Sequence, residues 1–136
     1  MADFAFPRSR RLKRRRLIRP LFDRTSDAQR ARAGTVTVLY RRVPREATGH
    51  DVGVQVGFAP GRRRTNVART AVRRFLREAF RLGQGPLLDA QAGRPDCLTL
   101  VVLYRGPDDG ASAAIRRDLP KALDRLLAAP PPDPAS

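Results

Sequence analysis

The pattern of apolar and polar residues predicts a helix over about residues 67–82, within the segment NVARTAVRRFLREAFRLG. At 3.6 residues per turn, one face of this helix is apolar. The residues on that face are Ala68, Val72, Phe75, Leu76 and Ala79. Asn66 stands where a side-chain oxygen would cap the first turn, and Leu82 and Gly83 form a suitable exit. The segment is therefore predicted to be an amphipathic helix.

Two further segments have the apolar spacing of helices. Near the N-terminus the apolar residues at this spacing are Leu17, Ile18, Leu21 and Phe22. Pro20 removes a hydrogen-bond donor, so this short helix either begins near Leu17 or is kinked. The second segment spans residues 111–129, and its apolar side consists of Ile115, Leu119, Ala122, Leu123, Leu126 and Leu127. Both segments are predicted to be amphipathic helices.

Three segments have the character of β-strands. Residues 34–42 are rich in β-branched residues, and residues 51–58 alternate valine or phenylalanine with smaller or polar neighbours. The loop VPREATGH between them has hairpin length, which predicts an antiparallel pair. Residues 97–105 follow the loop GQGPLLDAQAGRPD and form an apolar run, which is typical of a strand buried on both faces.

The predicted order of elements is helix, strand, strand, helix, strand, helix. This order describes an α+β domain in which helices and sheet form a two-layer sandwich. A chain of 136 residues is long enough for one domain with a core of its own. We predict a single domain over residues 1–129, with a mobile N-terminus over residues 1–9 and a disordered proline-rich tail over residues 130–136.

The chain is strongly basic, with 28 Lys and Arg against 13 Asp and Glu and a formal net charge of +15. Such an excess destabilises the compact state unless a polyanion or counterions screen it. Residues 8–24 hold 9 of the 28 basic residues, and residues 62–81 hold 8. Nucleic acid is the first candidate partner and an anionic membrane surface the second. The run 98–104 is too short to span a membrane, and no signal peptide is recognisable.

The basic residues of the predicted 67–82 helix lie opposite its apolar face. They follow one another at spacings of four, with one further arginine beside them: Arg69, Arg73, Arg77, Arg81 and Arg74. Glu78 can pair with one of them and leaves the others to repel one another. This stripe is either a solvated face or a surface for a polyanion. Arginine makes up most of the basic residues of the whole chain, so its abundance in this helix does not by itself indicate a ligand. The two dense basic blocks favour the polyanion.

No catalytic apparatus is predicted. Cys97 and His50 are the only cysteine and the only histidine, so no intramolecular disulfide, Cys/His zinc cluster or catalytic triad can form. Cys97 is predicted to be a small buried hydrophobe, and this cysteine usage fits a reducing cytoplasm. Asp108 and Asp109 are predicted to lie in a turn, because two adjacent carboxylates alone are poor ligands for magnesium.

Two aromatic residues are candidates for stacking on the bases of a single nucleic-acid strand. Phe22 lies within the first basic block, and Tyr40 ends a predicted strand just before Arg41 and Arg42. Arginine suits the same role, because its guanidinium group donates two parallel hydrogen bonds to a phosphate and stacks on bases. The alternative for each aromatic ring is ordinary packing in the core.

Four segments, in this order, resemble the protein subunit of bacterial ribonuclease P. They are RRLKRRRLIRPLF, VGVQVG before a basic loop, RTAVRRFLREAF, and DCLTLVVLYRG before a leucine-rich helix. The third segment is similar to the arginine-rich signature helix of that family. The resemblance covers nearly the whole chain except residues 1–7 and the proline-rich tail.

The resemblance implies an αββαβα fold with a left-handed crossover into the buried strand, an exception to the usual handedness. It also implies a non-catalytic partner of a catalytic RNA, which removes the 5′ leader of precursor tRNA using Mg²⁺ held by RNA and not by a protein site. In this family the signature helix faces the catalytic RNA, and a cleft between the sheet and the first helix holds the leader. The implied partners are ribonuclease P RNA and precursor tRNA, with no membrane and no obligatory protein partner, in the cytoplasm.

Residue by residue, the resemblance implies two sets of RNA-facing positions. Arg69, Arg73, Arg74 and Arg77 match positions of the signature helix, and the predicted RNA-binding set is completed by Arg62, Arg63, Arg64, Thr70 and Arg81. Ile18, Phe22 and Tyr40 match positions of the leader cleft, and the predicted leader-binding set is completed by Arg11, Lys13 and Arg14. Thr70 and Ala71 depart from the family signature, which has Asn and Arg there, and the basic loop before Arg69 is longer than usual.

Two other classes of function are alternatives. A structural RNA-binding protein, such as a ribosomal protein, would share the basic charge but would bind no leader. A free-standing nuclease would need a convergent cluster of acids or histidines, and the sequence pattern argues against one.

Overall fold

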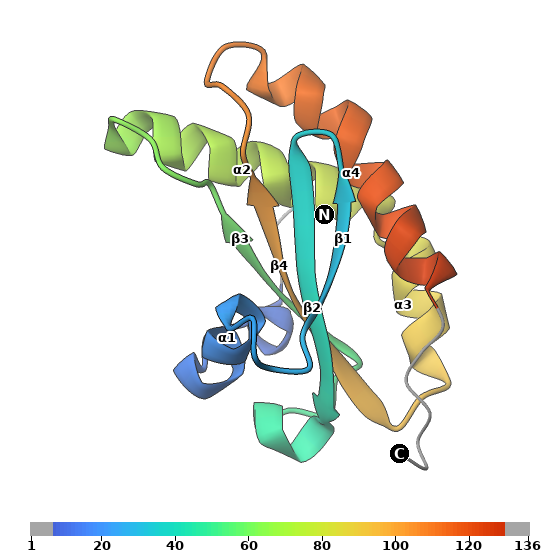
Figure 1. The fold of residues 1–136 in the computed structure, drawn as a ribbon. Coiled ribbons are helices and arrows are strands. Elements are labelled where there is room, and N and C mark those ends of the chain that lie inside the picture. The colour runs from blue at the N-terminus through green and yellow to red at the C-terminus, as the bar shows by residue number, and fades with distance from the viewer. Residues whose placement is uncertain (1–6, 130–136) are drawn as a thin grey trace.

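The computed structural model describes residues 7–129, and the predicted proline-rich tail and residues 1–6 lie outside this range. Four helices and a four-stranded sheet form one domain (Figure 1), and the predicted α+β class is confirmed. The helices are α1 (Arg15–Phe22), α2 (Asn66–Gly83), α3 (Gly85–Ala92) and α4 (Ala111–Ala128). The strands are β1 (Gln29–Ala33), β2 (Val36–Pro44), β3 (Val54–Ala59) and β4 (Asp96–Tyr104).

Strand β4 lies in the interior of the sheet, whose order is β1-β2-β4-β3. It pairs antiparallel with β2, with Val36 opposite Tyr104, and parallel with β3, with Val54 opposite Leu98. The predicted burial of this strand on both faces is confirmed. The predicted antiparallel pair of residues 34–42 with 51–58 is wrong, because the most apolar strand takes the interior position between them.

The parallel pair of β3 and β4 needs a crossover, which is provided by α2 and α3. Figure 1 shows α4 along one side of the sheet and α1 on the other. The left-handed sense expected for the crossover stays a prediction.

Two elements were not predicted. Strand β1 has the polar sequence QRARA, in which only Ala31 and Ala33 turn to the core, so its hydrophobic signal is weak. Helix α3 occupies a segment predicted as loop, and it buries Leu87 and Gln91. Helix α1 begins at Arg15, which puts Pro20 inside the helix instead of in its first turn.

The N-terminal segment is also more ordered than predicted. A short 3-10 helix, η1 (Arg8–Arg10), includes Arg8 and Ser9 of the range expected to be mobile. The side chain of Gln55 donates a hydrogen bond of 2.7 Å to the carbonyl oxygen of Ser9, and the backbone N–H of Leu12 donates one of 3.1 Å to Val56. The segment is thereby fixed along the edge of β3.

Side chains of β4 point alternately to two separate hydrophobic clusters. Leu98, Leu100, Val102 and Tyr104 pack with the buried faces of α2 and α4. Cys97 and Val101 pack on the opposite face with residues of α1. Cys97 is fully buried as predicted, and burial raises the pKa of its thiol to about 11. One strand therefore supports both faces of the sheet.

A buried carboxylate attaches α4 to the turn between β1 and β2. Asp118 is 4% exposed and accepts hydrogen bonds from the backbone N–H of Thr35 at 2.9 Å and from its hydroxyl at 2.7 Å. Arg117 donates to the same carboxylate at 2.9 and 3.1 Å. Gly34 has a φ of +56°, and a Cβ there would lie 2.5 Å from Asp118. These contacts, above all the hydrogen bond from Arg117, hold the pKa of Asp118 well below its usual range.

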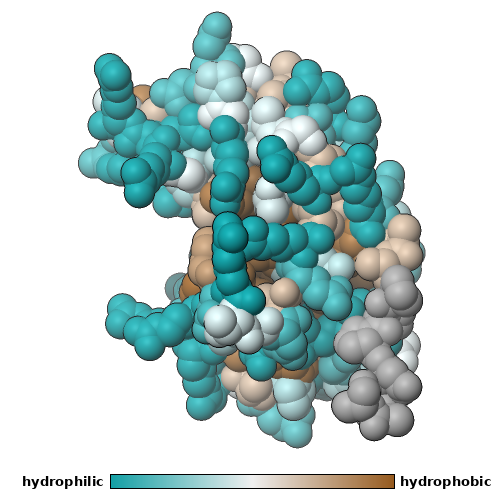
Figure 2. Space-filling view, in the orientation of Figure 1, coloured by the Kyte–Doolittle hydropathy of each residue, from teal (hydrophilic) through white to brown (hydrophobic). Residues whose placement is uncertain are grey.

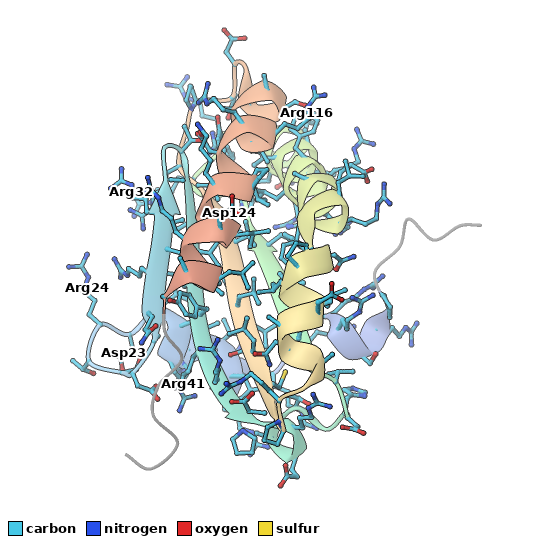
Figure 3. The ribbon with its side chains drawn as sticks, turned by 90° about the vertical axis from the view of Figure 1, so that its right-hand side faces the viewer. Asp23, Arg24, Arg32, Arg41, Arg116 and Asp124 are labelled. Carbon is cyan, nitrogen blue, oxygen red and sulfur yellow. The ribbon has the colours of Figure 1, made fainter. Side chains whose placement is uncertain are left out.

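We expect Asp118→Ala to lower the free energy of unfolding by about 2–3 kcal/mol, because it leaves two donors of Thr35 without their charged acceptor. Urea denaturation at neutral pH measures this loss. Asp124→Ala is the matched control, since Asp124 lies on the outer side of the same helix (Figure 3). A similar loss in the two variants would contradict the role given to Asp118.

The same carboxylate makes the stability depend on pH. Because its pKa is lower in the folded chain than in the unfolded chain, its contribution is present above the unfolded value, near pH 4, and is lost as the pH falls toward the folded value. The difference in stability between wild type and Asp118→Ala should therefore shrink in urea titrations below about pH 4.

Candidate nucleic-acid interface

Helix α2 carries the arginine stripe and is anchored by its apolar side. Val72, Leu76, Ala79 and Phe80 are buried, which confirms three of the predicted apolar positions and adds Phe80. The N-cap is Thr65, whose hydroxyl accepts a hydrogen bond of 3.0 Å from the backbone N–H of Ala68.

The predicted cap at Asn66 is wrong by one residue, because Asn66 is already the first helical residue. Its side-chain oxygen instead accepts a hydrogen bond from Arg69. Packing of the apolar side leaves the opposite side of α2 directed to solvent.

Three arginines of α2 form what we call the α2 arginine face: Arg73, Arg74 and Arg77. All three are exposed, and none has a hydrogen bond or ion pair to another residue in the described part of the chain. Thr70 is exposed one turn before Arg74. The nearest acid, Glu78, pairs with Arg81 at 2.6 Å. The face is therefore positive and has no internal counterion.

The two ends of the predicted stripe are engaged within the protein. Arg69 donates to the carbonyl oxygen of Arg63 at 3.4 Å as well as to Asn66, and it is only partly exposed. Arg81 is held by Glu78, three residues earlier on the same helix. These two arginines differ from the α2 arginine face in having partners.

Arg63 is a structural residue, which corrects its predicted role in RNA binding. Its side chain is 5% exposed and donates hydrogen bonds to the carbonyl oxygens of Pro60 at 2.7 Å and Gly106 at 2.8 Å. It also pairs with Asp108 at 2.7 Å and lies over the ring of Tyr104, 4.9 Å from the ring centre. The arginine thus joins two loops and is not available to a ligand.

The neighbours of Arg63 in the basic loop are placed differently. Arg62 and Arg64 are exposed, so they remain candidates for contact with RNA. Asp108, predicted to lie in a turn, follows β4 in the loop before α4 and is the acid to which Arg63 is bound.

The predicted leader-facing residues separate into two places. On α1, Leu17 and Leu21 are buried against the sheet, Ile18 is half-buried and Phe22 is 50% exposed. Arg11, Lys13 and Arg14 lie just before α1 and line a pocket. Figure 2 shows a hollow in the left outline of the molecule, where apolar surface is visible between projecting hydrophilic side chains.

Tyr40 does not lie with the other leader-facing residues. It is 3% exposed and belongs to the cluster that packs under α2 and α4, on the face of the sheet opposite α1. Burial raises the pKa of its hydroxyl group. The ring is core packing, so its predicted stacking on a leader base is corrected.

Two exposed arginines of β1 were missed by the sequence analysis. Ala31 and Ala33 face α4, so Arg30 and Arg32 point to the α1 side of the sheet. Figure 3 shows Arg24 and Arg32 projecting on the β1 side of the molecule, and nearby Arg41 of β2 pairs with Asp27 at 2.5 Å. The alternation of arginine and alanine in QRARA is typical of a strand with one buried face and would have predicted these exposed arginines.

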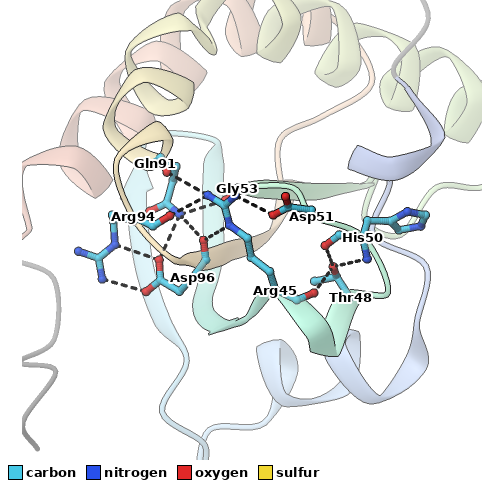
Figure 4. A network of polar contacts seen from close by, with 8 residues as sticks. All are labelled: Arg45, Thr48, His50, Asp51, Gly53, Gln91, Arg94 and Asp96. Carbon is cyan, nitrogen blue, oxygen red and sulfur yellow. Dashed lines mark hydrogen bonds and ion pairs between the residues drawn. The ribbon is translucent and has the colours of Figure 1, made fainter.

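A network around Arg45 fixes the loop after β2 (Figure 4). The guanidinium group donates to the carbonyl oxygens of Arg94 at 2.7 Å and Asp96 at 3.1 Å, and more weakly to Gln91 at 3.4 Å. It also pairs with Asp51 at 3.1 Å. The loop and its short 3-10 helix η2 (Arg45–Thr48) are thereby attached to α3 and to the start of β4.

The described residues contain no group of three His, Cys, Asp or Glu side chains that could hold a metal ion. No helix among the described residues is long and apolar enough to cross a membrane.

These features define a basic α+β domain that presents an arginine-bearing helix to solvent. The sequence model of the Ribonuclease P family matches residues 6–127, and the chain belongs to this family. No curated protein and no solved structure matches the chain. Membership in the family supports a role in tRNA processing by ribonuclease P and implies association with ribonuclease P RNA.

We expect Arg63→Ala to lower the free energy of unfolding by about 2–3 kcal/mol, because it removes several hydrogen bonds made by a buried charged group. Arg64→Ala, which removes an exposed arginine next to it, should change stability by less than about 0.5 kcal/mol. Thermal or urea unfolding of both variants measures the difference. Equal effects would show that Arg63 does not join the two loops.

Proposed function

We propose that the chain is the non-catalytic protein subunit of ribonuclease P and binds the catalytic RNA through the α2 arginine face. The observation that carries the proposal is the exposure of Arg73, Arg74 and Arg77 on a well-packed helix, with their nearest acid paired elsewhere. Guanidinium groups donate paired hydrogen bonds to phosphate. Because α2 is held by its apolar side, its arginines project to solvent from a backbone of fixed position. Arg62 and Arg64 extend this surface at the start of the helix.

We further propose that the α1 side of the sheet receives the single-stranded 5′ leader of precursor tRNA. Phe22 is the candidate stacking residue, because half of its surface is exposed while Leu17 and Leu21 hold the helix. Ile18 lies one turn before Phe22 and offers a smaller apolar surface. Arg11, Lys13 and Arg14 supply positive charge beside α1.

In this proposal the RNA carries out the cleavage. Mg²⁺ is held by the RNA subunit and the substrate, and the chain contributes binding and charge neutralisation. Several carboxylates of the chain are engaged with arginines, as Asp108 is with Arg63, Asp96 with Arg94 and Asp118 with Arg117. The family match supports this function over that of a ribosomal protein. The proposed location is the cytoplasm.

The test is cleavage of precursor tRNA by a bacterial ribonuclease P RNA at low magnesium concentration, with and without the chain. We expect the chain to raise the cleavage rate, because its cations replace part of the screening that magnesium provides. Affinity for the RNA should fall steeply with salt. The double variant Arg73→Ala with Arg77→Ala should lower the slope of log affinity against log salt by about one unit for each phosphate that the variant no longer neutralises.

Arg116→Ala with Lys121→Ala is the charge-matched control, since both residues are exposed on α4. This pair should leave the salt slope close to that of the wild type. An unchanged slope in the α2 variant, or an equal decrease in the two variants, would refute the assignment of the RNA surface to α2.

Phe22→Ala should weaken binding of precursor tRNA to the assembled holoenzyme by about fivefold to a hundredfold, because a base stacked on an aromatic ring contributes about 1–3 kcal/mol. Mature tRNA has no leader, so its binding should change by less than about twofold. Equilibrium binding of both tRNAs measures the two effects.

Leu82→Ala is the control, since Leu82 is another exposed apolar residue and lies at the end of α2. It should affect neither tRNA. Weakening of precursor and mature tRNA to the same degree by Phe22→Ala would show that the ring contacts the catalytic RNA or the tRNA body, and not the leader.

A further inference from the structure

A pocket of about 320 Å³ lies between the N-terminal segment and the loop after β2. Its lining residues are Arg8, Arg11, Lys13, Arg14, Thr48, His50 and Gln55. The two sides of the pocket come from residues 8–14 and 48–55, which are distant in sequence. We call it the His50 pocket.

Direct contacts hold the two sides of the His50 pocket together. The guanidinium group of Arg14 donates a hydrogen bond of 3.0 Å to the carbonyl oxygen of Ala47. Gly49 has a φ of +78°, a conformation that favours glycine, and a Cβ there would meet Nη2 of Arg14, so the guanidinium group lies directly against this turn. Gln55, which is buried, donates to Ser9 from the floor of the pocket. Two hydrogen bonds therefore connect the two sides of the pocket.

The charges around the pocket are of one sign. Four of the described lining residues are cationic, a fifth is the histidine, and none is acidic. The hydroxyl of Thr48 is already engaged within the loop: its single hydrogen lies between the carbonyl oxygens of Arg45 at 2.7 Å and His50 at 2.9 Å, and its oxygen accepts from the backbone N–H of His50 at 3.1 Å. A small group with several negatively charged oxygens is the ligand that such a set of donors fits best.

The imidazole ring of His50 points away from Asp51 and toward the N-terminal segment (Figure 4). The acids closest to His50 in sequence, Glu46 and Asp51, line a different pocket that His50 also borders, and Asp51 is paired with Arg45. The charged groups on the pocket side of the ring are the four cations of residues 8–14. A bound anion would therefore be the negative group closest to the ring within the pocket.

We propose that the His50 pocket binds a phosphate group and that protonated His50 donates to it, so that affinity falls as the pH rises through the titration of the imidazole. An imidazole exchanges its proton between about pH 5 and 8, and an adjacent anion stabilises its charged form. By linkage, the protonated chain must then bind the phosphate more tightly. If the phosphate belongs to RNA, this inference rests on the proposed function. Measurements on the chain without ribonuclease P RNA test phosphate binding by the pocket alone.

The experiment follows His50 by NMR in the untagged full-length chain, where it is the only histidine. The probes are a short oligouridylate with a 5′-hydroxyl end, inorganic phosphate, and sodium chloride at matched ionic strength. We expect the oligouridylate to move the titration midpoint of the imidazole upward by about half a unit to one unit relative to chloride. No movement with either the oligouridylate or inorganic phosphate, or the same movement with chloride, would overturn the proposal.

The pH dependence of affinity is read with the oligouridylate, because inorganic phosphate itself titrates near pH 6. Wild-type affinity should fall about threefold to tenfold between pH 5.5 and pH 8, and His50→Gln should remove this dependence. Lys13→Ala should weaken binding about threefold to tenfold at pH 6, whereas Lys121→Ala on α4 should not. A pH dependence retained in His50→Gln would also overturn the proposal.

The probes separate the two sources of phosphate. A response to both the oligouridylate and inorganic phosphate supports a site for the RNA backbone. A response to inorganic phosphate alone supports a site for free phosphate or a terminal phosphate. Because ribonuclease P RNA is not needed for these measurements, a failure here leaves the test of the α2 arginine face unaffected.

Discussion

The position of β4 between β2 and β3 determines how the rest of the domain is arranged. Its even-numbered side chains from Leu98 to Tyr104 form the floor on which α2 and α4 pack, and Cys97 and Val101 form the floor for α1. A strand buried on both faces excludes water from its hydrogen bonds and has few charged neighbours in the sheet. The charged residues are consequently placed on the outer sides of the helices, on the loops and on the β1 edge.

Arginine serves two distinct purposes in this chain. Arg45 and Arg63 each donate to several backbone carbonyl oxygens and join loops that no regular hydrogen bonding connects. Arg73 and Arg77 instead lie on the solvent side of a packed helix. Charge alone does not distinguish these purposes, because the flexible side chain of arginine reaches carbonyl oxygens as readily as it reaches phosphates. Partners and exposure in the fold decide which arginines remain for a ligand.

The sequence predicted α2 well, since a helix with one apolar side has a strong period, and it predicted the burial of β4 from its continuous apolar run. It failed on strand pairing, because hairpin-length spacing does not exclude a third strand from entering between two neighbours in sequence. It also failed on Tyr40. Residues 36–40 of β2 are all buried, so alternation could not show which face of the sheet this ring occupies. Which face of the sheet a side chain occupies depends on strands and helices that are distant in sequence. The local spacing of apolar residues does not reveal these partners.

The Arg45 network links the element that sequence reasoning missed to the surface next to His50. Gln91 of α3 donates to the carbonyl oxygen of Gly53 at 3.0 Å, and Arg45 reaches carbonyl oxygens at the end of α3 and the start of β4. The loop between Arg45 and Gly53 is therefore held at both of its ends, and His50 lies between them. A loop held in this way loses less conformational freedom when it binds a ligand than a free loop would. Helix α3 itself is held by the burial of Leu87 and Gln91 and by these hydrogen bonds, so it supports the surface next to His50 although its hydrophobic period is weak.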